Sequence, residues 1–205
     1  MILKINPDNP QPRLIRKVVE VLKKGGAIAY PTDTIYGLGC DLYHREGIKR
    51  IRNLRKHDKN KRLSILCADL KEISKYAYVP NYAFRMIKKL IPGAYTFILA
   101  ATKLVPKTML TKQKTVGIRV PDNNISFRIL KELENPIIST SVTKPDESLY
   151  NDPEEIDEMF GSSLEYVVDG GRIVPYHSSI IDFTEDQPRV LRKGKGDVSF
   201  IPEEE

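Results

Sequence analysis

Hydroxyl groups gather in segment 30–41, whose sequence is YPTDTIYGLGCD. The side chains of Thr32, Thr34 and Tyr36 can each donate and accept a hydrogen bond. The apolar run 27–30 predicts a strand that ends at the following proline, and two nearby glycines let the backbone turn tightly or approach a ligand. The segment is therefore typical of a ligand-binding loop, although a plain turn whose threonines cap the strand end has the same composition.

Further polar side chains follow other strands that the apolar pattern predicts. These are Thr96, Arg119, Ser139, Ser141, Ser178 and Arg192. In open α/β sheets, ligands bind outside the ends of strands, so side chains at these positions can meet around one small molecule. Taken singly, each has another interpretation, because serines after a strand commonly form a turn and an arginine there is commonly a surface residue. Their repeated position favours a shared pocket.

A basic run occupies segment 49–62 and contains Arg55, His57 and Lys61. Guanidinium and ammonium groups bind phosphate oxygens, so a dense cationic loop beside a pocket can hold a polyphosphate. The alternative is a solvated helix face and loop without a ligand. Because the loop leads directly into a predicted apolar strand, we favour the anion site.

Several well-known catalytic patterns are absent from the sequence. It contains no Ser-His-Asp arrangement, no H-E-x-x-H helix, no G-x-x-x-x-G-K-[ST] loop and no carboxylate pair that stands out as an acid–base couple. Enzymatic chemistry here would rest on positioning and charge neutralisation rather than on a protein nucleophile. Three histidines without a cysteine pairing argue against a structural zinc site, and we assign no metal ligands.

The composition bounds the class of protein. The chain has 205 residues, 40% apolar and 29% charged, as expected for a single globular domain over 1–205. Its net charge of +6 permits an anionic partner such as a nucleotide or nucleic acid without requiring one. No apolar run reaches the length of a membrane span, and the N-terminus lacks the layout of a signal peptide. Cys40 and Cys67 are too few for a disulfide framework, so we expect free thiols and a cytoplasmic location.

Apolar periodicity predicts helices interleaved with strands. The expected helices are 13–24, 47–55, 81–90, 125–133 and 153–160. The expected strands are 27–30, 63–68, 95–101, 115–120, 137–142, 166–168, 179–183 and 189–191. Some strands follow one another without a helix, which predicts an α/β or α+β fold with one twisted sheet of mixed direction covered by helices. We expect the tail 202–205 to be frayed.

Six segments resemble, in order, the motifs of the Sua5/YrdC/YciO family. They read AIAYPTDTIYGLGCD at 27–41, PGAYT at 92–96, GIRVP at 117–121, PIISTS at 136–141, SSIID at 178–182 and VLRKG at 190–194. The match extends over nearly the whole chain, and we expect no counterpart of the extra C-terminal domain of the longer Sua5 members. The opening PDNPQPRL at 7–14 resembles the YciO branch in particular.

The resemblance implies a single α/β domain of the YrdC-like (YrdC/RibB-type) fold with a positively charged concave face. In the best-known members, ATP, bicarbonate and L-threonine are converted with Mg²⁺ to L-threonylcarbamoyladenylate and pyrophosphate, and the product feeds the t6A modification of tRNA. A weaker relative could act on the same adenylate by hydrolysis. Some members are described as binding double-stranded RNA or tRNA, so a non-catalytic RNA-binding protein is the alternative, and a nucleotide sensor is a third.

Matched position by position, the resemblance also implies site residues. Substrate or nucleotide contacts are implied for Thr32, Tyr36, Thr96, Arg119, Ser139, Ser141, Thr143, Ser178 and Arg192. Catalytic positions are implied for Thr34, Arg55, His57 and Lys61. The family's synthases usually carry Lys-x-Arg where this chain has Arg55 and His57, and Asn where it has Thr143. A neutral imidazole lacks the fixed charge of a guanidinium, so Lys61 or Arg62 is the candidate substitute.

Overall fold

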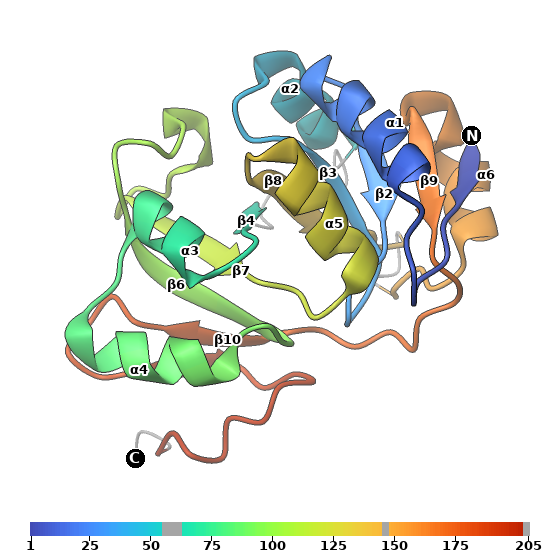
Figure 1. Cartoon of the computed structure of the whole chain (residues 1–205). Coiled ribbons are helices and arrows are strands. Elements are labelled where there is room, and N and C mark those ends of the chain that lie inside the picture. Colours follow the sequence, from blue (N-terminus) through green and yellow to red (C-terminus); the bar gives the residue numbers. More distant parts are fainter. Residues whose placement is uncertain (55–62, 145–147, 203–205) are drawn as a thin grey trace.

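The computed structural model describes residues 1–54, 63–144 and 148–202, which form a long twisted sheet with helices against its faces (Figure 1). The strands follow one another across the sheet in the order β1 (Ile2–Lys4), β9 (Tyr166–Asp169), β2 (Ile28–Tyr30), β3 (Gly37–Asp41), β8 (Ile137–Ser141), β4 (Ser64–Leu66), β7 (Thr115–Arg119), β6 (Tyr95–Ala101), β10 (Ser179–Asp182) and β11 (Arg189–Arg192), with β5 (Ala77–Tyr78) paired to β6. The sheet contains both parallel and antiparallel pairs; β4, for example, is parallel to β7 and antiparallel to β8. This mixed sheet confirms the predicted fold class.

Helices pack on both faces of the sheet. They are α1 (Pro12–Lys23), α2 (Arg45–Leu54), α3 (Leu70–Tyr76), α4 (Asn81–Leu90), α5 (Asn124–Leu133) and α6 (Pro153–Phe160), with short 3-10 turns at Lys107–Met109 and Gly161–Ser163. The buried side chains of α1 and α5 form one apolar cluster with the sheet. Those of α2, α3, α4 and α6 belong to a second cluster. The sheet is therefore the middle layer between two apolar cores.

The alternation of side chains along the strands explains the two cores. In β9, Val167 belongs to the cluster of α2 and α6, whereas Val168 packs with α1 and α5. Ile65 and Leu66 in β4 divide in the same way. Successive residues of a strand point to opposite faces, so a run of apolar residues feeds both layers.

Helix α1 shows how the sequence sets up the strand that precedes the hydroxyl-rich segment. Ile15, Val18 and Leu22 recur at helical spacing and are buried, and burial of each contributes roughly 1.5–3 kcal/mol. The helix ends at Lys23, and Gly25, which follows the C-cap residue Lys24, has φ +83° and donates its N–H to the carbonyl of Leu22 at 2.9 Å. Only a glycine adopts that conformation without strain, and the chain then turns directly into β2.

The structure adds elements that periodicity did not predict, namely β1, β3, β5 and α3. Strand β3 lies within segment 30–41, which composition alone marks as a loop or turn. Its glycines give close contact rather than turning, because a Cβ at Gly39 would lie 2.7 Å from the Tyr30 ring and 2.5 Å from Ile137. Because Gly39 has no side chain, the Tyr30 ring of β2 and the Ile137 side chain of β8 can pack against β3.

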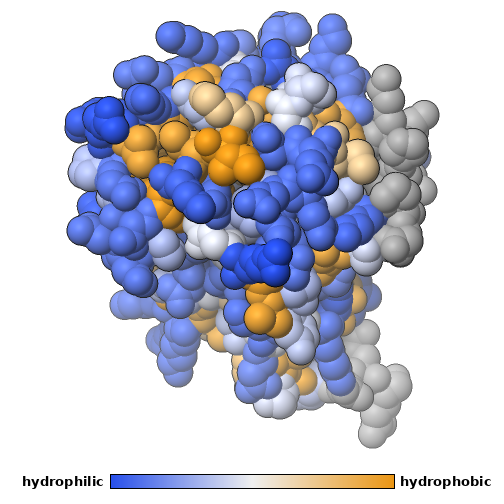
Figure 2. All heavy atoms as spheres, turned by 90° about the vertical axis from the view of Figure 1, so that its right-hand side faces the viewer, coloured by the Kyte–Doolittle hydropathy of each residue, from blue (hydrophilic) through white to orange (hydrophobic). Residues whose placement is uncertain are grey.

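One face of the molecular surface carries both hydrophilic and apolar side chains (Figure 2). Figure 2 shows the side with β1, β9 and α6, where hydrophilic side chains surround smaller apolar patches. Within the described residues, no helix combines the length and the apolar content needed to cross a membrane.

Candidate functional site

A cavity of about 280 Å³ lies over the middle of the sheet, along β7. Thr115, Gly117 and Arg119 are every second residue of this strand, so all three face the cavity. The residues on either side in the register face it too. At the level of Gly117 these are Ser64 and Ser139, which lie on β4 and β8.

The two ends of the cavity differ in chemistry. Beside Thr115, the lining includes Met109, Leu63 and Val116, and the hydroxyls of Thr111 and Thr115 bond to each other at 2.8 Å. At the other end, strand pairing sets Thr96 and Ile180 beside each other at the C-terminal end of β7, and Ile180 is paired with Arg192. One end is therefore largely apolar, and the opposite end carries guanidinium and hydroxyl groups.

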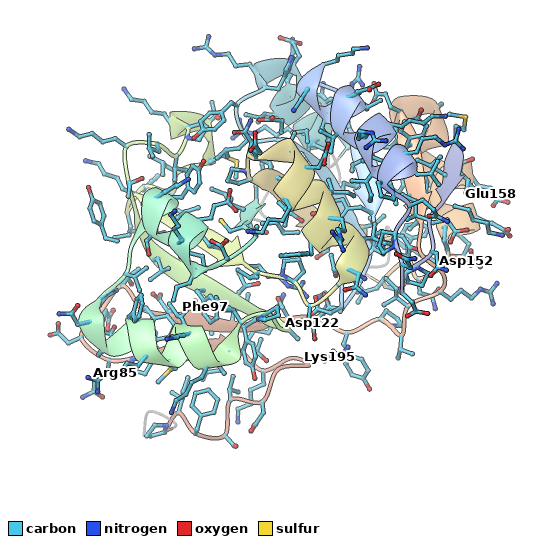
Figure 3. The ribbon with its side chains drawn as sticks, in the orientation of Figure 1. Arg85, Phe97, Asp122, Asp152, Glu158 and Lys195 are labelled. Carbon is cyan, nitrogen blue, oxygen red and sulfur yellow. The ribbon has the colours of Figure 1, made fainter. Side chains whose placement is uncertain are left out.

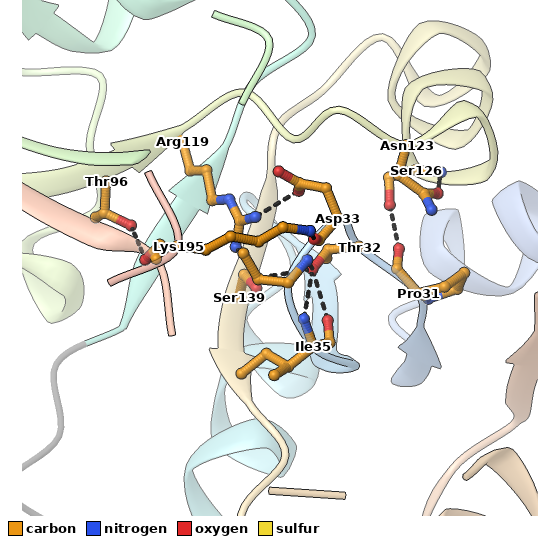
Figure 4. Close-up of polar contacts among 12 residues, drawn as sticks. Pro31, Thr32, Asp33, Ile35, Thr96, Arg119, Asn123, Ser126, Ser139 and Lys195 are labelled. Carbon is orange, nitrogen blue, oxygen red and sulfur yellow. Dashed lines mark hydrogen bonds and ion pairs between the residues drawn. The ribbon is translucent and has the colours of Figure 1, made fainter. Parts of the chain in front are cut away.

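Arg119 is the most buried cation of the site, with 7% of its surface exposed. Its Nη1 donates to Thr34 Oγ1 at 2.7 Å, and its Nη2 forms an ion pair with the carboxylate of Asp33 (Figure 4). Burial lowers the pKa of the guanidinium, while the Asp33 carboxylate acts in the opposite direction. The Nε group of Arg119 is buried without a hydrogen-bond partner. The ion pair fixes the segment after β2 against the end of β7.

The turn at Thr32 is held by its own hydroxyl. Thr32 Oγ1 donates to the carbonyl of Ile35 at 2.6 Å and accepts from the N–H of Thr34 and of Ile35 at 3.1 and 3.2 Å. A threonine side chain that satisfies two backbone donors in this way stabilises a tight turn. The turn predicted as the alternative to a ligand loop is thus present, and Thr32 also lines the cavity.

At the cationic end, three polar side chains bond to one another. Ser178 Oγ and Thr96 Oγ1 are 2.8 Å apart, and Arg192 donates to the Ser178 carbonyl at 3.0 Å and to its hydroxyl at 3.2 Å. Burial lowers the pKa of Arg192, and repulsion from Arg119 lowers it further. A second guanidinium so close to the first creates a local excess of positive charge, which favours an anionic ligand.

Ser139 sits on the cavity floor and is positioned from below. Tyr30 donates its hydroxyl hydrogen to Ser139 Oγ at 2.5 Å, and the buried phenol has a raised pKa, chiefly because of desolvation. The tyrosine ring passes beneath Gly37, where a Cβ would lie 3.0 Å from Tyr30 Cζ. The glycine, the tyrosine and the serine therefore form one packed unit across β2, β3 and β8.

The structure brings most of the sequence-predicted contacts together. The predicted residues that line the cavity are Thr32, Tyr36, Thr96, Arg119, Ser139, Ser141, Ser178 and Arg192. Thr34 is completely buried and is linked to the site by hydrogen bonds of its hydroxyl, which accepts from Arg119 and lies 3.1 Å from Thr32 Oγ1. Thr143 is not part of the lining and forms an isolated bridge with Leu149. Arg55, His57 and Lys61 lie outside the described residues.

Sequence reasoning did not single out Asp33, Thr111 or Lys195. Asp33 stands between two threonines that were selected, and its pairing with Arg119 joins positions 86 residues apart. The Nζ of Lys195 donates to the Asp33 carbonyl at 2.5 Å. A signal for Asp33 was its place within the hydroxyl-rich segment, whereas nothing in the local sequence marks Thr111 or Lys195.

A magnesium ion held by the protein does not fit the described part of the cavity. Its lining includes no carboxylate, and the described residues contain no cluster of three acidic, histidine or cysteine side chains suited to a metal. Asp33, which follows the lining residue Thr32, is already paired with Arg119. Mg²⁺ prefers oxygen ligands and commonly enters with substrate phosphates, so we derive no step through a protein-bound ion.

Both cysteines are free, as predicted, and the structure shows that both are buried and that neither lines the cavity. Burial raises the pKa of the Cys40 thiol to about 12 and that of Cys67 well above its ordinary value. A thiol kept protonated at neutral pH is a poor nucleophile. The cysteines therefore belong to the core rather than to the chemistry.

The fold and cavity define a class of protein: a mixed α/β domain with a ligand-sized cavity along a central strand and two arginines at one end. The chain belongs to the Sua5/YciO/YrdC family, whose model, described as "Telomere recombination", matches residues 20–194.

The relatives include proteins with and without an activity in their names. YciO of Escherichia coli K12 is 43% identical over 95% of both chains, and the crystal structure of E. coli YciO superposes with a TM-score of 0.94, covering 98% of this chain and 99% of that one. The threonylcarbamoyl-AMP synthase of Pyrococcus abyssi is 28% identical over 88% of this chain and 54% of its own length. P. abyssi Sua5 complexed with L-threonine has a TM-score of 0.88, covering 95% of this chain and 57% of that one.

Proposed function

We propose that this protein binds a nucleotide and L-threonine in the cavity along β7 and acts on L-threonylcarbamoyladenylate, either forming it from L-threonine, bicarbonate and ATP or hydrolysing it. The observation that carries the proposal is the division of the cavity into an apolar end and a cationic end. Relatives named as threonylcarbamoyl-AMP synthases, and a Sua5 structure that contains L-threonine, support the choice of substrate.

The dimensions of the cavity suit an adenylate. Thr115 and Arg119 stand at opposite ends of a five-residue strand, which corresponds to roughly 13 Å at about 3.3 Å per residue. A purine can occupy the apolar end beside Met109, where the hydroxyls of Thr111 and Thr115 are available to its polar edge. The phosphate then faces the end that carries Arg192.

The synthetic direction needs no protein nucleophile. The amine of L-threonine adds to bicarbonate with loss of water to give a carbamate, whose oxygen attacks the α-phosphorus of ATP while the bond to the leaving pyrophosphate breaks. Holding the two reactants in contact supplies much of the acceleration in such a reaction. Neutralisation of the developing charge by guanidinium groups supplies more. Positioning and charge neutralisation both suit the polar side chains of the cavity, which hydrogen bonds to neighbouring residues already hold in place.

The polar groups of the cavity divide these tasks in the proposal. Arg192 and the hydroxyls of Thr96 and Ser178 contact the phosphate, because they lie within one hydrogen-bonded group. Ser139 contacts the ribose or the amino-acid portion from the floor. Arg119 positions the segment that carries Thr32, since its Nη1 and Nη2 groups are engaged by Thr34 and Asp33.

The test uses purified full-length chain with ATP, Mg²⁺, bicarbonate and L-threonine, and measures pyrophosphate that depends on threonine. A parallel reaction supplies threonylcarbamoyladenylate and measures its loss. We expect turnover in at least one direction, and an Arg192→Met variant should lose most of it. Absence of both reactions in the parent protein would refute the proposed activity.

A further inference from the structure

The C-terminal segment 193–199, which we call the strap, is fastened to the sheet beside the cationic end of the cavity. Ser179 Oγ accepts from the N–H of Gly194 at 2.9 Å and donates to the carbonyl of Gly196. The N–H of Lys195 donates to the His177 carbonyl at 2.8 Å. The backbone on both sides of Lys195 is therefore fixed against the start of β10.

The strap lies closer to the sheet than a side chain would allow. A Cβ at Gly194 would lie 2.4 Å from the His177 carbonyl oxygen, and one at Gly196 would lie 2.5 Å from the Tyr95 ring. Tyr95 also donates its hydroxyl hydrogen to the Asp197 carbonyl at 3.0 Å. With two glycines pressed against the sheet, the intervening residue is held at one position along it.

Lys195 extends from the strap toward the middle of the molecule (Figure 3). Its Nζ reaches the backbone carbonyl of Asp33, the residue whose carboxylate binds Arg119 (Figure 4). Two cations from different elements thus meet at one residue of the turn that lines the cavity. Thr32, the neighbour of Asp33, is itself part of the lining.

The charges at this end do not balance. Asp33 supplies one carboxylate, and its partner is Arg119. Within the described part of the chain, Lys195 has a neutral carbonyl as its acceptor and no acidic partner. Arg192, with its pKa lowered by burial and by Arg119, adds a third positive group. An exposed ammonium bonded only to a carbonyl keeps its full charge available to an incoming anion.

We propose that Lys195 is a further substrate-binding residue, which leaves the Asp33 carbonyl and binds the phosphate chain of a nucleoside triphosphate beyond the α-phosphate. This inference rests on the proposed function, because it requires the nucleotide to enter with its phosphates toward Arg192. The ammonium group is a compact point charge on a flexible stem, which suits a phosphate group that leaves the site after reaction. The fixed strap holds the ammonium group beside Asp33, next to the lining residue Thr32.

The experiment compares the affinities of adenosine, AMP and ATP for the parent protein and a Lys195→Met variant by calorimetric titration. We expect the variant to bind ATP about tenfold more weakly, as for loss of a charged hydrogen bond, and to bind adenosine and AMP within about twofold of the parent. Lys17→Met, an exposed change of the same charge on α1, should leave all three affinities unchanged. Lys195→Arg should keep part of the preference for ATP.

The possible outcomes separate this inference from the proposed function. Unchanged ATP affinity in Lys195→Met would overturn the inference, and so would an equal loss for adenosine, AMP and ATP, which would indicate that Lys195 only supports the turn at Asp33. If the parent protein bound none of the three ligands, the nucleotide site itself would be wrong, and the role of Lys195 would fall with it.

Discussion

The ion pair between Asp33 and Arg119 is the most buried charged contact described at the site, with side-chain exposures of 10% and 9%. Removing one member of a buried pair leaves an uncompensated charge. We therefore expect Asp33→Ala to lower the free energy of unfolding by roughly 3–5 kcal/mol. Urea denaturation measures this change.

A matched comparison is available in the exposed pair of Lys131 and Asp69, whose side chains are 48% and 45% exposed. Solvent screens such a pair, so Lys131→Met should cost less than about 1 kcal/mol. Equal effects of Asp33→Ala and Lys131→Met would contradict the assignment of Arg119 as a buried, positioning residue.

Gly117 leaves open the floor of the cavity. A Cβ there would make ordinary contacts, at 3.4 Å from Ile98 and 3.5 Å from Thr96, so a small side chain fits without displacing the strand. Gly117→Val should fold normally and fill the floor. Since overpacking costs about 1–3 kcal/mol, we expect nucleotide affinity to fall by roughly tenfold or more. Titration with AMP measures the affinity, and the melting temperature checks that the variant is folded. An unaltered affinity would mean that the ligand binds elsewhere.

At the residue scale, the hydroxyls were predictable because several stand directly after apolar runs, where a sheet presents polar side chains to a ligand. The partner of Arg119 was not predictable. A carboxylate among threonines has the same appearance in a solvated turn, and only the pairing of distant strands brings Asp33 to the end of β7. A catalytic position was implied for Thr34, and in the structure its buried hydroxyl accepts a hydrogen bond from Arg119.

At the scale of elements, the strap is the part on which the cationic end depends. Gly194→Ala would place a methyl group 2.4 Å from the His177 carbonyl and 2.6 Å from the backbone of Ser178, so the strap must move. Neither contact is with a flexible side chain that could give way. We expect weaker ATP binding and a smaller difference between ATP and AMP than in the parent protein.

The control for this variant is Gly25→Ala. Gly25 has φ +83° and lies between α1 and β2, so the substitution strains the backbone outside the strap. It should lower stability while keeping the ratio of ATP to AMP affinity. Identical nucleotide binding by Gly194→Ala and the parent would show that the strap does not position the site.

Elements with strong periodicity were predictable and others were not. Helix 81–90 and strand 95–101 have the same bounds in the structure as in the prediction. Strand β3 was missed because two glycines in five residues contradict strand propensity, and its pairing depends on the Tyr30 ring that passes beneath it. Strand β1 has only three residues, too few for a periodic pattern, and it forms because it pairs with β9.

At the scale of the whole molecule, the sequence predicted a sheet of mixed direction but not the order of the strands within it. The alternation of helices and strands indicates an α/β architecture, whereas the contact of β1 with β9 joins segments more than 160 residues apart. The cavity results from that order, because β4, β6, β7, β8 and β10 contribute to one surface. Local sequence contains no information about such neighbours.

The net charge of +6 belongs to this scale as well and motivates the alternative of RNA binding. If the basic surface contacts several phosphates of duplex RNA, the affinity should fall steeply as salt rises, because condensed counterions are released on binding. A filter-binding series at increasing KCl concentration measures the slope. A flat response, or no binding at low salt, would remove this alternative and leave the nucleotide cavity unaffected.

The central claim is that the cavity along β7 holds an adenylate with its phosphate toward Arg192. A crystal structure of the protein soaked with ATP and L-threonine tests it directly. We predict ligand density between Thr115 and Arg192, with the base beside Met109 and phosphate oxygens within hydrogen-bond distance of Arg192. Ligand density on another surface, with this cavity empty, would contradict the account.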